Sequence, residues 1–331
     1  MKKLLLTSLI AITGLTLVAC GNKTTTRKTT KGNNSSTNQT TTTVTTTQAK
    51  KETVNILTPS GTPLMAIGGL IGEEGINIET VSGADNIATE LAKNSLDIIV
   101  APLTAGAKLY IAGKSKYKLE AVVTTNNTYI ISKKTTTLSS ITDLAGKKIV
   151  AYGLNNTPDI ALQNAIKTNN VEDVTITYEN DVTTATSTFL GGSDYDYCLI
   201  AEPQITALKV NKGLDLNVLD LSEYMSTTIY QAGIFVNPNA NQTRCNEVIE
   251  QIKNNITSLN ANPTEYANTV LNKNDFFTKM GATVLAQSIP NANISFIKAK
   301  DNKDNIIAYY TEVNNYKAAI LNGMVDNEFF R

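Results

Sequence analysis

The sequence has no histidine and no tryptophan among its 331 residues. The absence of histidine excludes a Ser-His-Asp triad, histidine metal ligands and the usual side chain for sensing physiological pH. Acidic and basic residues also balance, at 29 each, so the formal net charge is zero. Nucleic-acid-binding proteins need a basic surface. We therefore expect no nucleic-acid partner, no metal and no cofactor.

Cysteine is scarce, with three residues in the whole chain. Cys198 falls in an apolar run that predicts a buried strand, and Cys245 falls in a later helical pattern. Two cysteines of an extracytoplasmic protein could form a disulfide. Two separate buried thiols are the interpretation that these surroundings favour.

The third cysteine, Cys20, ends an N-terminal targeting segment. Two lysines precede the apolar run 4–18, which is interrupted by Thr, Ser and Gly and is shorter than the roughly 20 residues that span a bilayer. The run ends in Leu-Val-Ala-Cys-Gly, which resembles the processing box of bacterial lipoproteins. We predict a signal peptide over residues 1–20, with Cys20 lipidated and retained on the extracytoplasmic face of the bacterial cell membrane. An ordinary signal with a chance cysteine is the alternative.

The next segment is rich in threonine. Residues 24–47 contain 13 threonines, and Val44 is their only large apolar residue. Such a segment cannot bury enough apolar surface to offset the entropy of ordering it. We predict a disordered tether over residues 21–52, or alternatively a mucin-like stalk. Residues 53–331 suffice for one large domain or two of ordinary size.

From residue 54 onward the pattern predicts strands and helices in alternation, which is typical of α/β folds with parallel sheets. The predicted strands span 54–57, 76–81, 97–100, 119–124, 129–132, 147–152, 174–178, 196–200 and 229–236. The predicted helices span 64–70, 86–93, 104–112, 158–166 and 183–190, and another follows Pro203. After Pro238 the tail is predicted to be mainly helical, with helical spacing over 248–259 and 306–324, and to pack on the first part of the chain.

Two blocks of this pattern resemble each other. A strand followed by Ser60-Gly61-Thr62-Pro63 in the first block matches a strand followed by Asn155-Asn156-Thr157-Pro158 in the second. Ala101-Pro102 similarly matches Glu202-Pro203. The repetition is weak and chance similarity could produce it, but it suggests two α/β lobes of one plan.

Both Thr-Pro pairs indicate helix starts, with Thr as the N-cap and Pro at the first helical position. Free N–H groups at such starts, beside the carboxyl ends of strands, are where open α/β sheets bind ligands, although simple capping is the alternative. Motifs of enzymes are missing. No Lys follows Gly61 as in a phosphate loop, no Gly-x-Gly-x-x-Gly occurs, and Ser115-x-x-Lys118 lacks its partner motif. Asp194 and Asp196 suggest a solvated turn. We predict no catalytic residue.

These motifs together resemble a known family. Asp143-Leu144-Ala145-Gly146-Lys147-Lys148-Ile149, the run Asp97 to Pro102, and Ala201-Glu202-Pro203 are similar to segments of type II periplasmic binding proteins of the nitrate, sulfonate/taurine and thiamine-precursor class. The resemblance covers residues 53–331 and implies an α/β fold of two lobes, each a mostly parallel sheet flanked by helices. Lobe 1 would comprise 53–130 and 235–331, and lobe 2 would comprise 131–234. The strands 129–132 and 229–236 would cross between them.

The resemblance further implies an extracytoplasmic receptor of an ABC importer, which captures a small polar or organic-anion solute by closure of the lobes. Its partners would be that solute and an ABC permease with its ATPase, and we expect a monomer. By position, the cleft would be lined by Thr58, Ser60, Gly61, Ser82, Gly83, Pro102, Thr104, Asn126, Asn127, Asn155, Asn156, Thr157 and Glu202.

Arginine marks a departure from this family. The chain has three, Arg27, Arg244 and Arg331, and none lies in a predicted cleft loop. A clamp on a carboxylate or sulfonate would therefore be missing, although helix starts and hydroxyls could still hold an anion. Glu202 could bind a cationic ligand or simply favour the first turn of its helix. Few aromatic residues fall in the predicted loops, which weakens a stacked heteroaromatic ligand.

Two alternatives belong to other function classes. Fold does not fix function, so an enzyme on the same two-lobed fold is one of them, although the histidine that some relatives use is absent. The other is a surface adhesin lipoprotein with a degenerate cleft.

Overall fold

The computed structural model describes residues 51–81, 84–192 and 194–331. All of them fall in one compact unit, residues 49–331. The predicted signal peptide with Cys20, most of the predicted tether, and the predicted site residues Ser82 and Gly83 lie outside the described residues.

The first sheet has the strand order β11-β4-β10-β3-β1-β2. Its strands are β1 (Val54–Pro59), β2 (Ile76–Val81), β3 (Ile98–Pro102), β4 (Lys118–Thr125), β10 (Tyr230–Val236) and β11 (Ile294–Lys298). β1 is parallel to β2 and β3, whereas β10 runs antiparallel to β3 and β4. Strands β1 to β4 therefore all point in one direction.

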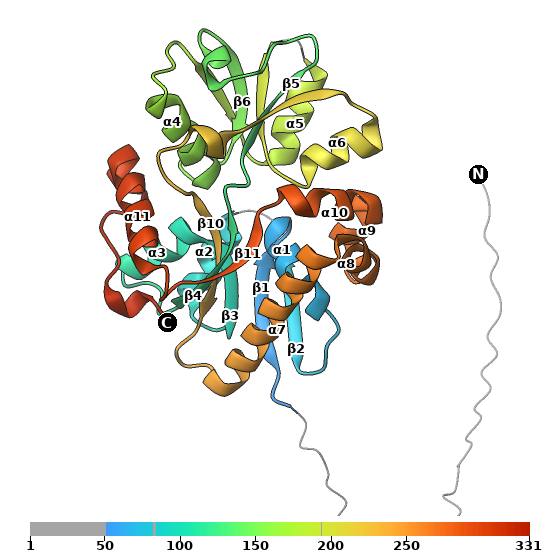
Figure 1. The fold of residues 1–331 in the computed structure, drawn as a ribbon. Helices are drawn as coiled ribbons and strands as arrows, with labels where there is room; N and C mark the ends of the chain where they lie inside the picture. Colours follow the sequence, from blue (N-terminus) through green and yellow to red (C-terminus); the bar gives the residue numbers. More distant parts are fainter. Residues whose placement is uncertain (1–50, 82–83, 193) are drawn as a thin grey trace, which may run out of the picture. The chain divides into compact units, whose positions relative to one another are not determined.

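The second sheet has the order β7-β6-β8-β5-β9. Its strands are β5 (Tyr129–Lys133), β6 (Lys148–Tyr152), β7 (Thr175–Glu179), β8 (Tyr197–Ile200) and β9 (Leu216–Asp220). β6 is parallel to β7 and β8, and β5 is antiparallel to β8 and β9. Each sheet with its helices is called a lobe below, and Figure 1 shows the two lobes with β6 and β5 in one and β1 to β4 in the other.

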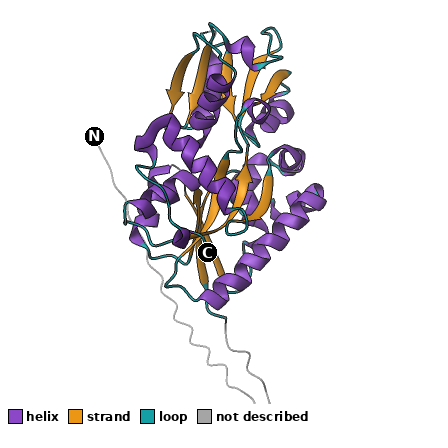
Figure 2. Cartoon of the chain, turned by 60° about the vertical axis from the view of Figure 1, so that its left-hand side comes forward, coloured by secondary structure: helices purple, strands orange, loops and turns teal. Residues whose placement is uncertain are grey.

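Helices flank both sheets (Figure 2). The first lobe carries α1 (Thr62–Ile67), α2 (Ala84–Lys93), α3 (Leu103–Ile111), α7 (Gln242–Ala261), α8 (Pro263–Val270), α9 (Asp275–Met280), α10 (Ala282–Ser288) and α11 (Lys303–Lys317). The second carries α4 (Thr157–Thr168), α5 (Val182–Gly191) and α6 (Gln204–Lys212). Short 3-10 turns are η1 (Gly68–Leu70), η2 (Ile141–Leu144), η3 (Leu221–Tyr224), η4 (Ile289–Asn291), η5 (Ala318–Ile320) and η6 (Asn327–Phe329).

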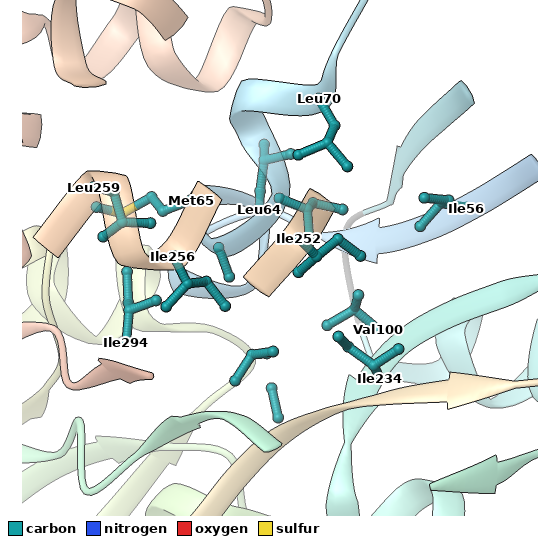
Figure 3. Packing of buried hydrophobic residues seen from close by; sticks show 14 of the residues in the cluster. Ile56, Leu64, Met65, Leu70, Val100, Ile234, Ile252, Ile256, Leu259 and Ile294 are labelled. Atoms are coloured by element: carbon teal, nitrogen blue, oxygen red, sulfur yellow. The ribbon is translucent and has the colours of Figure 1, made fainter. Parts of the chain in front are cut away.

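The first sheet is buried on both faces, which explains its continuous apolar strands. Successive side chains of a strand point to opposite faces. Ile56 and Val100 accordingly pack with α1 and α7, as Figure 3 shows, whereas Leu57 and Ile99 pack with α3 and α11. The second sheet repeats this plan, since Ile149 packs on the α4 side and Val150 on the α5 side.

The predicted alternation of strands and helices is confirmed in both lobes, with three differences in the elements. β9 and β11 are strands that the sequence analysis missed, so the tail is not only helical. The helix predicted over 306–324 ends at Lys317, because a 3-10 turn and Gly323, with φ of 148°, follow it. The two cysteines Cys198 and Cys245 are buried and unpaired, as predicted.

Corresponding residues of the two repeated blocks also make the same pair of hydrogen bonds. In the first lobe, the Asn55 N–H donates to Asp97 Oδ2 (2.8 Å) and the Asp97 N–H donates to the Asn55 carbonyl (3.2 Å). In the second, the Lys148 N–H donates to Asp196 Oδ2 (3.1 Å) and the Asp196 N–H donates to the Lys148 carbonyl (2.9 Å). Asp196 therefore fixes the start of β6 through an exposed hydrogen bond, and both Asp194 and Asp196 lie in bends, in agreement with the predicted solvated turn. β1 lies between β2 and β3 as β6 lies between β7 and β8.

Candidate functional site

The carboxyl ends of the parallel strands in both lobes lie at the junction between the lobes. β4 ends at Thr125 and the chain enters β5 at Tyr129, so this edge of the first sheet faces the second lobe. Tyr129 pairs with Ile200 at the end of β8, so the carboxyl ends of β6, β7 and β8 lie where the chain enters. The starts of α1, α3, α4 and α6, which follow these strands, therefore gather at the junction. This is where open α/β sheets bind ligands.

Two segments cross the junction, residues 126–128 and 225–229, and they are tied together. The Asn126 N–H donates to the Ile229 carbonyl (3.0 Å), and the Ile229 N–H donates to Asn126 Oδ1 (2.8 Å). Gln231 accepts from the Asn127 N–H (2.8 Å) and donates to the Asn127 carbonyl (3.1 Å). The crossing strands predicted at 129–132 and 229–236 instead belong to one sheet each, as β5 and β10.

Asn127 and Glu202 hold each other at this junction. Asn127 Nδ2 donates to the Glu202 carbonyl (3.1 Å), and the Glu202 N–H donates to Asn127 Oδ1 (2.8 Å). The Glu202 carboxylate accepts from the Thr206 N–H (3.0 Å) and hydroxyl (2.9 Å), so it serves the first turn of α6. Burial raises the pKa of Glu202, and the bonds from Thr206 partly offset that rise.

The loop between β1 and α1 brings three predicted residues to the junction edge. Thr58 is buried and its hydroxyl donates to the Pro59 carbonyl (3.2 Å), whereas Ser60 is exposed. The N-cap is Gly61, not Thr62 as predicted, and no side chain caps the helix. Gly61 has φ of 99° and ψ of −151°, a conformation that only glycine adopts readily. That conformation starts the helix one residue before the expected place.

The loop between β6 and α4 shows the same one-residue displacement. Asn156 is the N-cap in place of the predicted Thr157, and its side chain makes no capping bond. Asn155 turns the chain with φ of 59°, a left-handed conformation that asparagine tolerates. Thr157 is buried at the first helical position, where its hydroxyl has no hydrogen-bond partner among the described residues.

Asp159 is a buried site residue that the sequence analysis missed. Its Oδ2 accepts from the Asn155 N–H (2.7 Å) and the Tyr316 hydroxyl (3.2 Å), and its Oδ1 accepts from the Tyr178 hydroxyl. The side chain is completely buried. Three donors from a loop, from β7 and from α11 therefore converge on one carboxyl group. An acidic residue in the first turn of a helix is common, which is why Asp159 gave no distinctive signal.

Helix α11 of the first lobe reaches the helix starts of both lobes. Lys317 Nζ donates to Asn155 Oδ1 (2.7 Å), and the Tyr310 hydroxyl donates to the Leu103 carbonyl at the start of α3 (3.2 Å). Figure 1 shows α11 beside α3 and near α4. Ile160 of α4 is part of the same apolar cluster as Tyr309 and Tyr310. Helix α11, which is not one of the predicted cleft loops, therefore brings tyrosines to the junction.

Three buried hydroxyls near these contacts have no hydrogen-bond partner among the described residues, those of Thr104, Thr157 and Tyr309. The Tyr309 ring lies between those of Tyr230 and Tyr310, with centroids 5.8 and 5.6 Å away. Burial raises the pKa of Tyr309, and the facing Thr157 hydroxyl opposes that rise although the pair does not reach hydrogen-bond geometry. Pro102, half-buried at the end of β3, precedes this region. The hydroxyls thus come from α3, α4 and α11.

Both arginines of the described chain are used elsewhere. Arg244 donates to the Glu52 carbonyl (3.1 Å), and Arg331 pairs with Glu120 (2.6 Å) beside the start of β4. The prediction that no arginine clamp lines the cleft loops agrees with these positions. The surface also has two hollows. One follows the turn between α7 and α8, and the other is lined by Glu120, Asn246, Ile249, Glu250, Lys298, Lys300 and Arg331.

Two α/β lobes, joined by two crossing segments with helix starts gathered at the junction, define a type II periplasmic-binding-protein fold. Solved structures share it at low identity. An ABC transporter protein from Parabacteroides distasonis has a TM-score of 0.71 and 18% identity over 85% of this chain and 99% of its own. The periplasmic aliphatic sulphonate binding protein SsuA from Escherichia coli has a TM-score of 0.67 and 14% identity over 84% and 91%.

The chain belongs to the NMT1/THI5-like family, whose sequence profile matches residues 67–265, more than half of the chain. No curated protein matches it. A putative sulfonate-binding SsuA from Methylobacillus flagellatus is a further structural neighbour, with a TM-score of 0.58 and 15% identity over 85% of this chain and 92% of its own. The fold and family confirm the predicted resemblance. In the described residues, no helix is both long and apolar enough to cross a bilayer.

Proposed function

We propose that this protein is the extracytoplasmic solute-binding lipoprotein of an ABC importer. It captures a small polar solute between its lobes and releases it to a permease. The observation that carries the proposal is the gathering of four helix starts from both lobes beside two crossing segments. A ligand that contacts both lobes favours the closed arrangement, and hinges of a few residues absorb the motion.

The lobes proposed to move are residues 53–130 with 235–331, and residues 131–234. Contacts to the solute are proposed chiefly from the exposed Ser60, from the half-buried Asn156 at the N-cap of α4, and from the buried hydroxyls of Thr104 and Thr157. Thr58, Gly61, Ser82, Gly83, Pro102 and Asn155 complete the proposed lining. Asn126, Asn127 and Glu202 are proposed to support the junction, because their side chains already make hydrogen bonds within it.

The attachment to the membrane is proposed to be the lipidated Cys20, followed by the Thr-rich tether. The lipobox-like sequence supports this, and a lipid-anchored receptor needs no spanning helix of its own. Changing Cys20 to Ala should move the protein from the membrane fraction to the soluble or secreted fraction of the producing cells. Retention of the variant in membranes would contradict the anchor.

A thermal-shift screen with small solutes tests the binding function. At least one solute should raise the unfolding temperature saturably, as mass action requires for a ligand of the native state. The double change Asn156→Ala with Thr157→Ala should abolish that shift, whereas Lys167→Ala with Thr168→Ala, exposed at the other end of α4, should leave it intact. A folded protein that responds to no solute would favour a surface adhesin instead.

The position of the site is tested separately from its existence. A solute shift that survives the Asn156 and Thr157 changes would place the binding site elsewhere on the protein. A monomer is expected in solution, and size-exclusion chromatography with light scattering measures this directly. Importer function further requires a permease and ATPase that respond to the loaded protein in reconstituted membranes.

A further inference from the structure

A buried carboxylate, that of Asp159, offsets the partial positive charge at the start of α4. Helix starts attract anions because their N–H groups are free and the helix dipole is positive there. At α4, Asp159 lies in the first turn and takes the Asn155 N–H of the preceding loop. It pairs with no Lys or Arg in the described chain. Its charge is therefore not neutralised by a partner ion.

The start of α6 is similarly occupied. Glu202 lies before its first turn, is 6% exposed, and accepts both donors of Thr206. The second lobe thus turns two buried carboxyl groups toward the junction. Lys317 brings an ammonium group to the start of α4, where it is exposed and already bonded to Asn155 Oδ1 (2.7 Å). Solvent screens an exposed ammonium more strongly than it screens a buried carboxylate.

The groups left without partners are uncharged. Thr104 (3% exposed), Thr157 (4%) and Tyr309 (0%) each have a hydroxyl with no hydrogen-bond partner in the part of the chain that the structure describes, although those of Thr157 and Tyr309 face each other. Buried polar groups normally find a partner, so each such group needs an explanation. A hydroxyl can donate or accept, and it therefore suits amide, hydroxyl or ring-nitrogen groups of an uncharged solute.

Resting on the proposed function, we propose that the junction site takes an uncharged or cationic hydrogen-bonding solute and rejects anions. Asp159 sets this selectivity. Thr157 and Asp159 share the first turn of α4, so an anion bound at that turn would meet the charge of a buried carboxylate, and like charges in a partly buried site repel strongly. This differs from the sulphonate-binding proteins that share the fold.

Three probes of one shape test the charge preference. Methanesulfonate, dimethyl sulfone and trimethylsulfoxonium are nearly isosteric and carry negative, zero and positive charge. Binding to the full-length protein is measured by ligand-observed NMR at millimolar concentrations. The wild-type protein should bind dimethyl sulfone or trimethylsulfoxonium at least tenfold more tightly than methanesulfonate. A wild-type protein that binds methanesulfonate as well as the other two would overturn the proposal.

Asp159→Asn tests the assigned residue by a gain of binding. The variant should bind methanesulfonate at least tenfold more tightly than the wild type, and an unchanged affinity would overturn the role of Asp159. Asp143→Asn is the matched control, because it removes one negative charge from the second lobe at a site remote from the junction. If Asp159→Asn does not fold by circular dichroism, the wild-type ranking of the three probes still decides the charge preference.

The outcomes separate this inference from the proposed function. A solute screen whose hits are all anions leaves a binding protein standing but removes the selectivity proposed for it. A silent screen removes the proposed function itself, and the inference falls with it.

Discussion

The two lobes start corresponding helices with the same two residues and then differ at the third. α1 begins Thr62-Pro63-Leu64, and α4 begins Thr157-Pro158-Asp159. Leu64 and Asp159 are both completely buried. Leu64 packs in the apolar cluster beneath α7, whereas Asp159 accepts hydrogen bonds from a loop, from β7 and from α11. The same backbone arrangement thus accommodates a buried apolar side chain at the start of α1 and a buried carboxyl group at the start of α4.

The second pair of corresponding helix starts differs in the same way. Ala101 precedes Pro102 in the first lobe, and Glu202 precedes Pro203 in the second. Ala101 is buried among apolar residues, whereas the Glu202 carboxylate is hydrogen-bonded to Thr206. At both positions the second lobe has a carboxylate where the first has an apolar side chain. The two lobes share the order of their parallel strands but differ in the side chains at their helix starts, which are apolar in the first lobe and carboxylic in the second.

The largest loss of stability is expected when the buried carboxylate of the second lobe is introduced at the corresponding position of the first lobe. Leu64→Asp puts a carboxylate into an apolar core that offers it no donors and should destabilise the fold by more than about 4 kcal/mol. Leu64→Met keeps the volume and should cost less than about 1.5 kcal/mol. Urea unfolding of both variants measures the difference. Equal stability of the two would show that this position tolerates charge after all.

The converse change in the second lobe should have the next largest effect. Asp159→Ala leaves the Asn155 N–H and the hydroxyls of Tyr178 and Tyr316 without their acceptor. Buried unsatisfied donors cost about 1–3 kcal/mol each, so a loss of at least about 2 kcal/mol is expected in chemical unfolding. Asp159→Asn retains an acceptor oxygen and should lose less. A harmless Asp159→Ala would mean that water replaces the carboxylate at no cost.

The pH dependence of stability should distinguish the start of α6, which has Glu202, from the start of α3, which has Ala101 at the corresponding position. Burial raises the pKa of Glu202 above its usual 4.5 in the fold. The folded protein therefore holds this proton more tightly, and the unfolding free energy should fall as pH rises through the window above 4.5. Glu202→Gln should remove that fall, because glutamine does not titrate; its oxygen can still accept from the Thr206 N–H, and its amide can donate to the Thr206 hydroxyl.

Asp143 provides the opposite slope as an internal control. Hydrogen bonds from Ser139 and Ser140 lower its pKa, so its contribution is present above its unfolded value and is lost as pH falls through its folded value. Asp143→Asn should remove only this acid-side loss. Glu202→Gln and Asp143→Asn curves that change in the same direction would contradict the assignment.

The smallest effect is expected at the contact between α11 and the second lobe. Lys317→Ala removes one exposed hydrogen bond to Asn155 and should change stability by less than about 0.5 kcal/mol. Hydrogen exchange of the amides in 155–159 should nevertheless become several-fold faster, while those in 58–64 stay unchanged. Ser60→Ala, an exposed change at the corresponding loop of the first lobe, should affect neither segment.

The sequence predicted the plan of the fold because apolar runs and helix starts are local signals. Strands from 54 to 200 were placed within one or two residues, and the Thr-Pro repetition correctly paired the two lobes. β9 and β11 were missed because both are short strands with polar residues between their apolar ones. Capping was misplaced by one residue at Gly61 and Asn156, since the unusual φ of Gly61 itself, and that of Asn155 beside Asn156, decide where each helix begins.

The candidate site was less accessible from the sequence because its contacts join distant parts of the chain. Asp159 binds Tyr316, which lies 157 positions later, and Lys317 binds Asn155 over 162 positions. Periodicity identifies α11 as a helix with a buried face but does not say that it touches the second lobe. Solute contacts at the predicted loop residues remain a proposal, whereas the support given by Asn127 to the junction is visible in the structure.

The contact between Arg244 and Glu52 has a mechanical consequence. Glu52 lies two residues before β1, and Arg244 and Asn241 of the α7 region hold it there. β1 runs from this point toward Pro59, so the hold is at the edge of the first sheet opposite the helix starts. These two hydrogen bonds therefore fasten the residues before β1 to the α7 region, at the end of the first sheet that lies away from the crossing segments.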